Sequence, residues 1–239
     1  MGLKKIRWLK FGSKEVAASS PATVEQSGYS VSEEIVVLQP AARGADYGVR
    51  ELATQILTQQ IEIGRRGIAL CGAHAGAGVT FTAANLAAAL AELGVSTLLI
   101  EANLRAPRLR ELIVPPREVM GLTEYLQAER PDRAELFQWG VLDNLALVYA
   151  GAATPNATEL LSSGAFKDLV QSSLRDFVYT IVDTPPANSS SDARIISAAV
   201  GYSMIVARPG ATYVDDVAAL SQQLREDGSV IVGALLNGG

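Results

Sequence analysis

The stretch Gly67–Arg105 reads GIALCGAHAGAGVTFTAANLAAALAELGVSTLLIEANLR, and its succession of patterns decides the fold. A short apolar run is followed by a glycine-rich turn, an alanine-rich segment of helical character and a second apolar run. We place these elements, in that order, at residues 68–71, 72–78, 80–93 and 97–100. Gly94 stands where a glycine commonly ends a helix, and Glu101 closes the second strand. Strand, turn, helix and strand form one βαβ unit, whose two strands run parallel.

The glycine-rich turn departs from the phosphate-binding pattern G-x-x-x-x-G-K-[ST] at its central position. In that pattern, backbone N–H groups at a helix N-terminus hold phosphates, the lysine reaches the β- and γ-phosphates, and the hydroxyl holds Mg²⁺. Here Gly78 and Thr80 fill the second glycine and hydroxyl positions, but Ala73 replaces the first glycine and Val79 the lysine. Valine provides neither a charge nor a donor. We therefore expect no cofactor, or only weak binding of ATP or ADP with Mg²⁺.

Motifs beyond this turn carry a resemblance to a known family. They read AGAGVTF, ANLA, IEANLRAP, GAATPNATELL, IVDTPP and GALLN, at residues 75–81, 84–87, 100–107, 151–161, 181–186 and 233–237. With these motifs in this order, residues 45–237 resemble the bacterial tyrosine kinase family of exopolysaccharide synthesis, which is close to the MinD and ParA ATPases with deviant Walker motifs. The resemblance implies a P-loop NTPase-like α/β fold with a doubly wound, mostly parallel sheet of roughly seven or eight strands.

The resemblance also implies which residues would meet a nucleotide. The candidate nucleotide-binding residues are Gly76, Ala77, Gly78, Val79, Thr80, Phe81, Arg208 and Asn237. Of these, Arg208 and Asn237 stand where relatives approach the nucleotide base. Thr80 and Asp183 are the candidate Mg²⁺ ligands, because Asp183 ends an apolar strand at the Walker B position. The alternative for Asp183 is a turn-forming role in the sequence Asp-Thr-Pro-Pro.

The catalytic positions implied by the family are altered. Glu101 and Asn103 stand where the family has two aspartates. Glutamate keeps the charge on a side chain one methylene longer, whereas the amide of Asn103 cannot serve as a carboxylate base. We therefore expect no intact catalytic residue, with Glu101, Asn103 and Asp183 as vestigial members. Arg105 or Arg208 could supply a substitute cation, although neither lies in the turn.

The first 44 residues differ in composition from the rest. We predict a basic N-terminal segment with a flexible linker over residues 1–44 and the P-loop NTPase-like domain over residues 45–239. Residues 1–14 contain five basic residues and no acidic one, with apolar residues at near-helical spacing among them. The pattern is typical of a helix that binds an anionic membrane surface or docks on a partner, and a merely solvated terminus is the alternative. We interpret residues 17–32 as linker and residues 34–38 as an edge strand.

The remaining patterns alternate between helix and strand. We predict helices over residues 45–63, 121–127, 134–137, 165–174 and 214–224, and strands over residues 145–149, 177–182, 204–206 and 230–236. In the resembled family, the first of these helices joins subunits into a ring through an E-x-x-R-x-x-R face. Here Tyr47, Arg50 and Ala53 stand at those positions, so a plain packing helix and a homo-oligomer contact both stay open.

Composition excludes several function classes. The single cysteine, Cys71, excludes an internal disulfide framework, and the single histidine, His74, excludes a metal site built from several histidines. The formal net charge of −5 leaves little basic surface for phosphate backbones, so we expect no nucleic-acid partner. The sequence has no apolar run of about 18 residues, the length from which a membrane-spanning helix is inferred.

These observations favour a noncatalytic homologue, a pseudokinase, that acts as a scaffold or regulator in bacterial exopolysaccharide or capsule biosynthesis and export. The alternative is an active ATP-dependent protein-tyrosine kinase or ATPase that uses unusual phosphate ligands. The resemblance implies a membrane polysaccharide chain-length or copolymerase protein as the partner. It also implies a cytoplasmic, peripheral location at the inner membrane, with residues 1–14 as the attachment.

Overall fold

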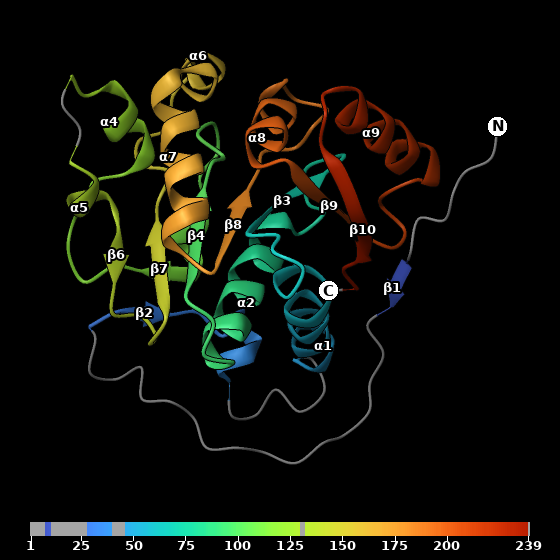
Figure 1. The fold of residues 1–239 in the computed structure, drawn as a ribbon, viewed down its shortest axis with the longest axis horizontal. Coiled ribbons are helices and arrows are strands. Elements are labelled where there is room, and N and C mark those ends of the chain that lie inside the picture. The colour runs from blue at the N-terminus through green and yellow to red at the C-terminus, as the bar shows by residue number, and fades with distance from the viewer. Residues whose placement is uncertain (1–7, 11–27, 40–45, 130–131, 239) are drawn as a thin grey trace.

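A sheet of eight strands forms the centre of the molecule (Figure 1). The computed structural model describes residues 8–10, 28–39, 46–129 and 132–238. In chain order the strands of the sheet are β1 (Trp8–Lys10), β3 (Gly67–Gly72), β4 (Thr97–Glu101), β6 (Gln138–Trp139), β7 (Leu145–Val148), β8 (Tyr179–Asp183), β9 (Tyr202–Ala207) and β10 (Val230–Leu236). Across the sheet they lie in the order β1-β10-β9-β3-β8-β4-β7-β6. Every neighbouring pair is parallel except β6 and β7.

Helices cover both faces of the sheet, as the predicted doubly wound fold requires (Figure 1). One face carries α1 (Tyr47–Ile56), its π-helical continuation η3 (Leu57–Ile61) and α2 (Val79–Glu92); the other carries α7 (Gly164–Asp176), α8 (Asp192–Val200) and α9 (Val214–Glu226). The shorter helices are α3 (Leu109–Leu112), α4 (Leu122–Gln127), α5 (Arg133–Leu136) and α6 (Ala157–Ser162). Alternate residues of β3 enter the two cores: Ile68 and Leu70 on the α2 side, Ala69 and Cys71 on the α8 side. The fold class is confirmed.

The alanine content of α2 follows from its burial on all sides. Residues 82–91 are buried throughout, because α2 packs on one face of the sheet and is also in contact with α1, η2 and α3. Small side chains allow this close approach at the packing density of a protein interior. Leu86 and Leu90 are fully buried, whereas Leu93 is the C-cap of the helix and is 48% exposed.

The edge strand predicted for residues 34–38 is wrong. Residues Val36–Leu38 form a 3-10 helix, η2, and Ile35 and Val37 are buried against α2. The amide of Asn85 replaces a strand partner: it accepts from the Val37 N–H and donates to the Glu34 carbonyl. A buried side chain thus satisfies the backbone groups that a sheet neighbour would otherwise bind.

The linker predicted for residues 17–32 ends in structure rather than in coil. β2 (Ser30–Val31) pairs antiparallel with β5 (Ile113–Val114) to form a separate two-stranded sheet. Residues 28–39 therefore pack on the α/β domain. The division of the chain at residues 44 and 45 stays a prediction, because residues 11–27 and 40–45 lie outside the described residues.

The helix expected in residues 1–14 is not found in the part that the structure describes. Trp8–Lys10 forms β1, which pairs in parallel with β10 from Trp8 opposite Ala234 to Lys10 opposite Leu236. The outer edge of β10 presents backbone groups that a neighbouring strand can satisfy, and this pairing explains the extended conformation. The rest of residues 1–14 lies outside the described residues.

The helix predicted over residues 45–63 is formed by α1 and η3 together. Its Arg50 makes contacts within the chain: its guanidinium binds Asp46 at 2.9 Å and Glu92 at 2.7 Å and donates to the Val37 carbonyl. These contacts favour the packing role that the sequence left open. The homo-oligomer contact stays a prediction.

Candidate functional site

The glycine-rich turn lies at the carboxyl ends of the parallel strands, between the last residue of β3 and the first of α2. Gly76 and Gly78 both adopt positive φ, at 79° and 84°. At Gly78 the absence of a side chain is essential, since a Cβ would lie 2.0 Å from the Asn237 amide nitrogen. The turn can therefore follow its path only with glycine at this position.

The backbone N–H groups of the turn form a cradle without internal partners. Within the described residues, no N–H from residue 75 to residue 81 donates a hydrogen bond, and the first donor of the helix is Thr82, to the Gly78 carbonyl. These groups lie at the N-terminus of the 14-residue helix α2, where the helix dipole adds positive potential. An anion is the ligand that such a cradle accepts.

Two of the predicted nucleotide residues reach the turn from the carboxyl-terminal third of the chain. Arg208 follows β9 and donates from Nη1 to the Gly76 carbonyl at 3.4 Å, and Asn237 follows β10 and donates from Nδ2 to the Ala77 carbonyl at 3.3 Å. Both contacts are long for hydrogen bonds to oxygen. All eight predicted nucleotide residues thus lie close together at the carboxyl ends of the parallel strands.

The Val79 side chain packs against the apolar core and does not contribute to the cradle. Its side chain is half-buried and packs against the apolar cluster that contains α1 and α2. Its Cγ2 would lie 2.8 Å from a Cβ at Gly72, so the valine leans toward the end of β3. The position that would carry a phosphate-binding lysine is therefore filled by a methyl group in apolar contact.

Asp183 remains placed for a cation. It is the last residue of β8, stands in register between Leu70 and Glu101, and is 1% exposed. Both carboxylate oxygens are buried and have no hydrogen-bond partner within the described residues. Burial, together with the nearby charge of Glu101, raises the pKa of Asp183 well above its usual value; the Thr80 hydroxyl lies near enough to oppose the shift, although no hydrogen bond of ordinary geometry joins the two.

The residues present fit a magnesium ion in part. A buried carboxylate with no partner beside a threonine hydroxyl is the donor set that Mg²⁺ takes up with water and phosphate oxygens. Thr80 and Asp183 would hold the ion, and the cradle would hold the phosphates. The missing part is the countercharge inside the turn.

Glu101 is turned away from this site. One carboxylate oxygen accepts from the N–H groups of Arg108 and Leu109, the latter at 2.6 Å, and the other accepts from Ala150 at 3.0 Å. The carboxylate thus fastens the start of α3 and the end of β7. Burial raises the pKa of Glu101, and these three backbone donors oppose the shift.

Asn103 closes a local loop. Its side-chain amide donates to the Ala106 carbonyl at 2.9 Å and accepts from the Ala106 N–H at 3.2 Å. An amide makes this reciprocal pair, whereas a carboxylate could only accept. Asn103 is therefore a structural residue in this loop.

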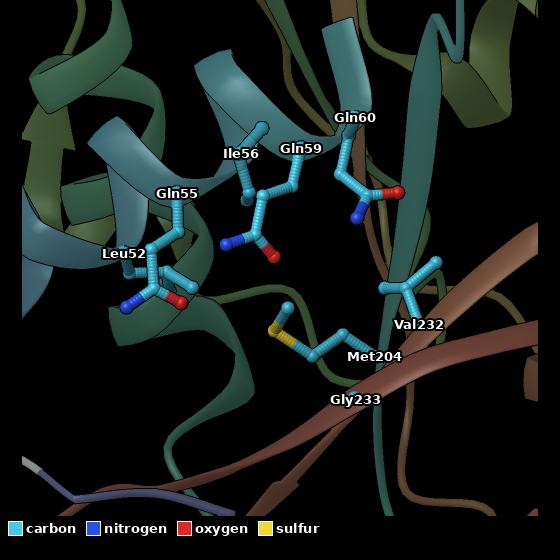
Figure 2. A pocket seen from close by; sticks show the side chains of 8 residues that line it. All are labelled: Leu52, Gln55, Ile56, Gln59, Gln60, Met204, Val232 and Gly233. Carbon is cyan, nitrogen blue, oxygen red and sulfur yellow. The ribbon is translucent and has the colours of Figure 1, made fainter. Parts of the chain in front are cut away.

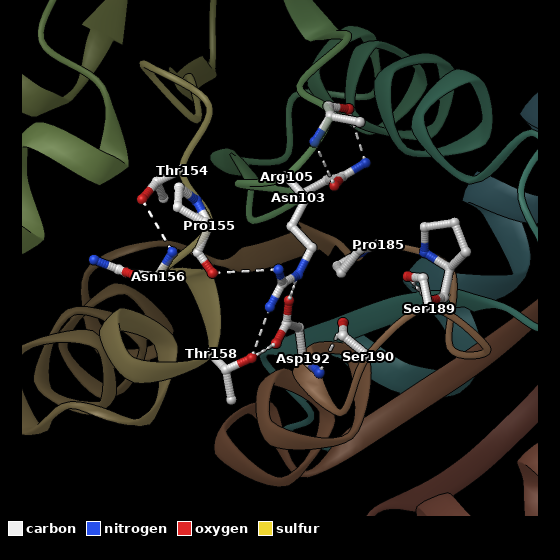
Figure 3. A network of polar contacts seen from close by, with 12 residues as sticks. Asn103, Arg105, Thr154, Pro155, Asn156, Thr158, Pro185, Ser189, Ser190 and Asp192 are labelled. Carbon is white, nitrogen blue, oxygen red and sulfur yellow. Dashed lines mark hydrogen bonds and ion pairs between the residues drawn. The ribbon is translucent and has the colours of Figure 1, made fainter.

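Arg105 is held in a polar network that joins the loop after β4 to the starts of α6 and α8 (Figure 3). Its guanidinium binds the buried Asp192 at 2.7 Å and also reaches the Thr158 hydroxyl at 2.8 Å and the Pro155 carbonyl at 3.3 Å. The Thr158 hydroxyl in turn donates to Asp192. Burial raises the pKa of Asp192, but the hydrogen bonds from Arg105 and Thr158 lower it by more, so the net shift of the pKa is downward. With its donors engaged, Arg105 is not available as a substitute cation.

Sequence reasoning missed the residues that hold these loops. His74 contacts Asp216 at 2.8 Å and Asn188 at 2.9 Å, and Asp192 and Thr158 complete the Arg105 network. The partners of each lie far apart in the sequence, so spacing gave no signal for them. The one available signal was a histidine inside a glycine-rich turn, where an apolar or small residue would be expected.

A separate crevice lies between α1 with η3 and the strands β9 and β10 (Figure 2). Its volume is about 30 Å³, the size of a single water molecule, and it is lined by Leu52, Gln55, Ile56, Gln59, Gln60, Met204, Val232 and Gly233. None of the predicted nucleotide or metal residues lines it. This crevice plays no part in the site.

Comparison with known proteins identifies relatives over most of the chain, although no protein-family model matches it. The chain is 32% identical over 170 residues to the tyrosine-protein kinase CpsD of Streptococcus pneumoniae, covering 71% of this chain and 74% of that protein. It is also 32% identical over 197 residues to the tyrosine-protein kinase etk of Escherichia coli, covering 82% of this chain but only 27% of etk.

Solved structures agree with this. The kinase domain of the Escherichia coli tyrosine kinase ETK matches with a TM-score of 0.79 and 30% identity, over 85% of this chain and 79% of that domain. The septum site-determining protein MinD of Pyrococcus horikoshii, solved with Mg-ADP, matches with a TM-score of 0.62 at 17% identity, over 72% of this chain and 70% of that protein. The second likeness concerns the fold alone.

Proposed function

This chain belongs to the bacterial tyrosine-protein kinase family, and we propose that it is a noncatalytic member of it, a pseudokinase that acts as a scaffold or regulator. The observation that carries this proposal is the side chain at the lysine position of the turn: Val79 packs into the apolar core and offers no charge to a phosphate. Phosphoryl transfer depends almost wholly on positioning and on charge stabilisation, so this loss affects the centre of the chemistry.

The surrounding residues support the same conclusion. Glu101 and Asn103 are committed to backbone groups of neighbouring loops, and Arg105 is bound to Asp192. Among the bases and cations of the described site, only Asp183 and Arg208 are not committed to neighbouring groups: the Asp183 carboxylate has no hydrogen-bond partner, and Arg208 makes a single long contact. A cationic donor in such a site contributes about 3 kcal/mol, or at least a hundredfold in rate.

Nucleotide binding would be weak where it occurs. The residues 75–81 would hold phosphates with their N–H groups, Thr80 and Asp183 would hold Mg²⁺, and Arg208 and Asn237 would border the base. When bound, Mg²⁺ would supply charge neutralisation to the phosphates. At the position where relatives with the full motif have a lysine, the chain supplies no full charge and offers only the partial charges of its backbone N–H groups.

The test is an assay for turnover. We expect neither ATP hydrolysis nor tyrosine phosphorylation above buffer background when the protein is incubated with radiolabelled ATP and Mg²⁺. Turnover that disappears when Asp183→Asn removes the carboxylate would refute the pseudokinase proposal. Turnover that persists in Asp183→Asn would instead identify a contaminating enzyme.

The alternative function, an active ATP-dependent kinase or ATPase with unusual phosphate ligands, has one observation in its favour. Arg208 reaches the turn through a single long contact and is exposed, so its guanidinium is available to rotate toward a bound phosphate. If turnover is found, Arg208→Lys should lower it and Arg208→Ala should abolish it. Equal turnover in all three proteins would exclude Arg208 as the replacement cation.

We further propose that the protein acts in bacterial exopolysaccharide or capsule biosynthesis and export, with a membrane polysaccharide chain-length or copolymerase protein as its partner. Support comes from its relatives, which are tyrosine-protein kinases, and from the motifs that resemble the tyrosine kinase family of exopolysaccharide synthesis. The proposed location is cytoplasmic and peripheral at the inner membrane. No helix in the described part of the chain is long and apolar enough to cross a membrane. Residues 1–14 are the proposed attachment because they contain five basic residues and no acidic one, with apolar residues among them.

A further inference from the structure

His74 joins the glycine-rich turn to two segments that lie far from it in the sequence. Its Nδ1 meets the amide nitrogen of Asn188, in the turn that follows β8, at 2.9 Å. Its Nε2 meets a carboxylate oxygen of Asp216, in the first turn of α9, at 2.8 Å. Both ring nitrogens therefore have a partner, and the imidazole spans the gap between the two segments.

The partners determine where the ring hydrogen lies. An amide nitrogen can only donate, so Nδ1 accepts from Asn188 and Nε2 carries the hydrogen that is donated to Asp216. The same oxygen of Asp216 accepts from the Tyr213 N–H at 3.3 Å, which holds the carboxylate at the start of α9. Each of the two hydrogen bonds of the His74 ring thus joins one donor to one acceptor.

The other hydrogen bonds that hold the turn either lie at its start or have long donor–acceptor distances. The N–H groups of Ala187 and Asn188 donate to the carbonyls of Gly72 and Ala73, at 2.9 and 3.1 Å. Beyond His74, the side chains of Arg208 and Asn237 reach the turn at more than 3.2 Å. His74 is therefore the last firm anchor before the residues whose N–H groups have no partner.

We propose that His74 is the positioning residue of the glycine-rich turn. It holds residues 75–79 on the path that leaves their N–H groups unpaired for an anion, and it couples that path to α9 and to the loop behind Asp183. The inference rests on the turn being the anion site of the proposed function, and it holds whether or not the protein turns over ATP. Preorganisation of this kind raises affinity because the site does not have to be ordered on binding.

The experiment compares two single substitutions with a matched charge control. Asp216→Ala removes the carboxylate that accepts from His74, and Asp215→Ala removes the same group one residue away, where the exposed side chain has no hydrogen bond or ion pair within the described residues. His74→Ala removes the ring, and His74→Gln restores an amide donor and acceptor. The readouts are ¹⁵N relaxation order parameters of Gly76, Ala77 and Gly78 and the calorimetric affinity for inorganic pyrophosphate.

We expect order parameters near 0.85 in the intact protein and below about 0.6 in His74→Ala and Asp216→Ala. If the altered turn is competent for about a tenth of the time, the pyrophosphate affinity falls roughly tenfold. His74→Gln should recover part of both values, and Asp215→Ala should match the intact protein. A melting-temperature measurement on each variant identifies any that fails to fold, in which case the Asp216 and Asp215 pair decides.

Three results would overturn the proposal: unchanged order parameters in His74→Ala, equal effects of Asp216→Ala and Asp215→Ala, or lost order with unchanged pyrophosphate affinity. An intact protein that binds no pyrophosphate would overturn it too, since the turn would then not be an anion site. Neither readout involves catalysis. ATP turnover by the intact protein would therefore refute the noncatalytic function while leaving the role of His74 standing.

Discussion

At the residue scale, the loop after β4 is built for asparagine rather than aspartate. The Asn103 amide both donates to and accepts from the backbone of Ala106. In Asn103→Asp the donor is lost and a carboxylate oxygen faces the Ala106 carbonyl. We expect the free energy of unfolding to fall by about 1–2 kcal/mol, measured by urea denaturation. The control is Asn156→Asp, the same change at an exposed side chain, which should stay within about 0.5 kcal/mol of the intact protein. A stabilised Asn103→Asp would contradict this account of the loop.

Val79 allows the missing charge to be restored. We expect the intact protein to bind Mg-ATP weakly, with a dissociation constant of about 100 μM or higher, corresponding to about 5.5 kcal/mol or less. Val79→Lys should raise the affinity about tenfold or more, because an ammonium in the turn would pair with the phosphates. Val230→Lys adds the same charge at the start of β10 and should have no effect. Low-micromolar affinity of the intact protein in calorimetry would contradict the expectation, as would a failure of Val79→Lys to tighten binding.

The sequence was sufficient for the positions of the site residues but not for the directions of their side chains. Strand ends and motif order fix the backbone positions of four site residues, which therefore meet at the carboxyl ends of the parallel strands. They are Val79, Asp183, Arg208 and Asn237. The turn of Glu101 toward Leu109 and Ala150 depends on loops whose paths no local pattern specifies. The same holds for His74, whose two partners are more than a hundred residues away.

At the element scale, most strands of the main sheet and the helices α1, α2, α7 and α9 were predictable because each is set by its own periodicity, whereas α8, β6 and the β2–β5 pair were not predicted. The apolar run before Asp183 and the alanine-rich composition of α2 agree with the burial of both elements. η2 was not predictable: residues 34–38 have the composition of a strand, but Asn85 of α2 satisfies their backbone instead. β1 likewise depends on the open edge of β10 and not on its own spacing. Tertiary partners decided both cases.

The Arg105 network is the element-scale feature with the clearest consequence for stability. Arg105→Ala leaves Asp192 buried without its cation, and we expect a loss of about 2–3 kcal/mol in the free energy of unfolding at pH 7. The matched control is Arg194→Ala, which breaks the more exposed pair with Asp227 and should cost about 0–1 kcal/mol. Urea denaturation measures both.

The same network has a defined pH dependence. The pKa of Asp192 is lowered in the folded protein, so its contribution to stability is present above the unfolded pKa of about 3.9 and is lost as pH falls through the folded pKa. The stability difference between the intact protein and Arg105→Ala should therefore be largest at neutral pH and shrink in acid. A difference that stays constant from pH 7 to pH 3 would mean that the carboxylate is not the group that Arg105 stabilises.

At the scale of the whole molecule, charge is unevenly divided along the chain. Residues 1–14 carry five of the 20 basic residues and none of the 25 acidic ones, so the remainder has a strong acidic excess. Each basic residue near an anionic leaflet contributes about 1 kcal/mol, and apolar groups that enter the interface add to this. An acidic body repels the same surface, so attachment through this segment should be reversible and sensitive to salt.

We therefore expect the full chain to sediment with liposomes of anionic lipid at low salt and to be released at high salt. Deleting residues 1–14 should abolish sedimentation. The comparison must include the melting temperature, because β1 lies within this segment and pairs with β10. A three-residue strand at the sheet edge makes few backbone hydrogen bonds, so we expect a shift of only a few degrees.

The outcomes separate three roles for the segment. Sedimentation that disappears while the fold is retained supports membrane attachment, and replacing Lys4, Lys5 and Arg7 with glutamine should reproduce the loss without removing β1. If the intact protein does not sediment at low salt, the membrane proposal is wrong and docking on an acidic partner surface becomes the better explanation. A large fall in melting temperature on deletion, absent from the glutamine variant, would show that the segment serves mainly as the edge strand that pairs with the open edge of β10.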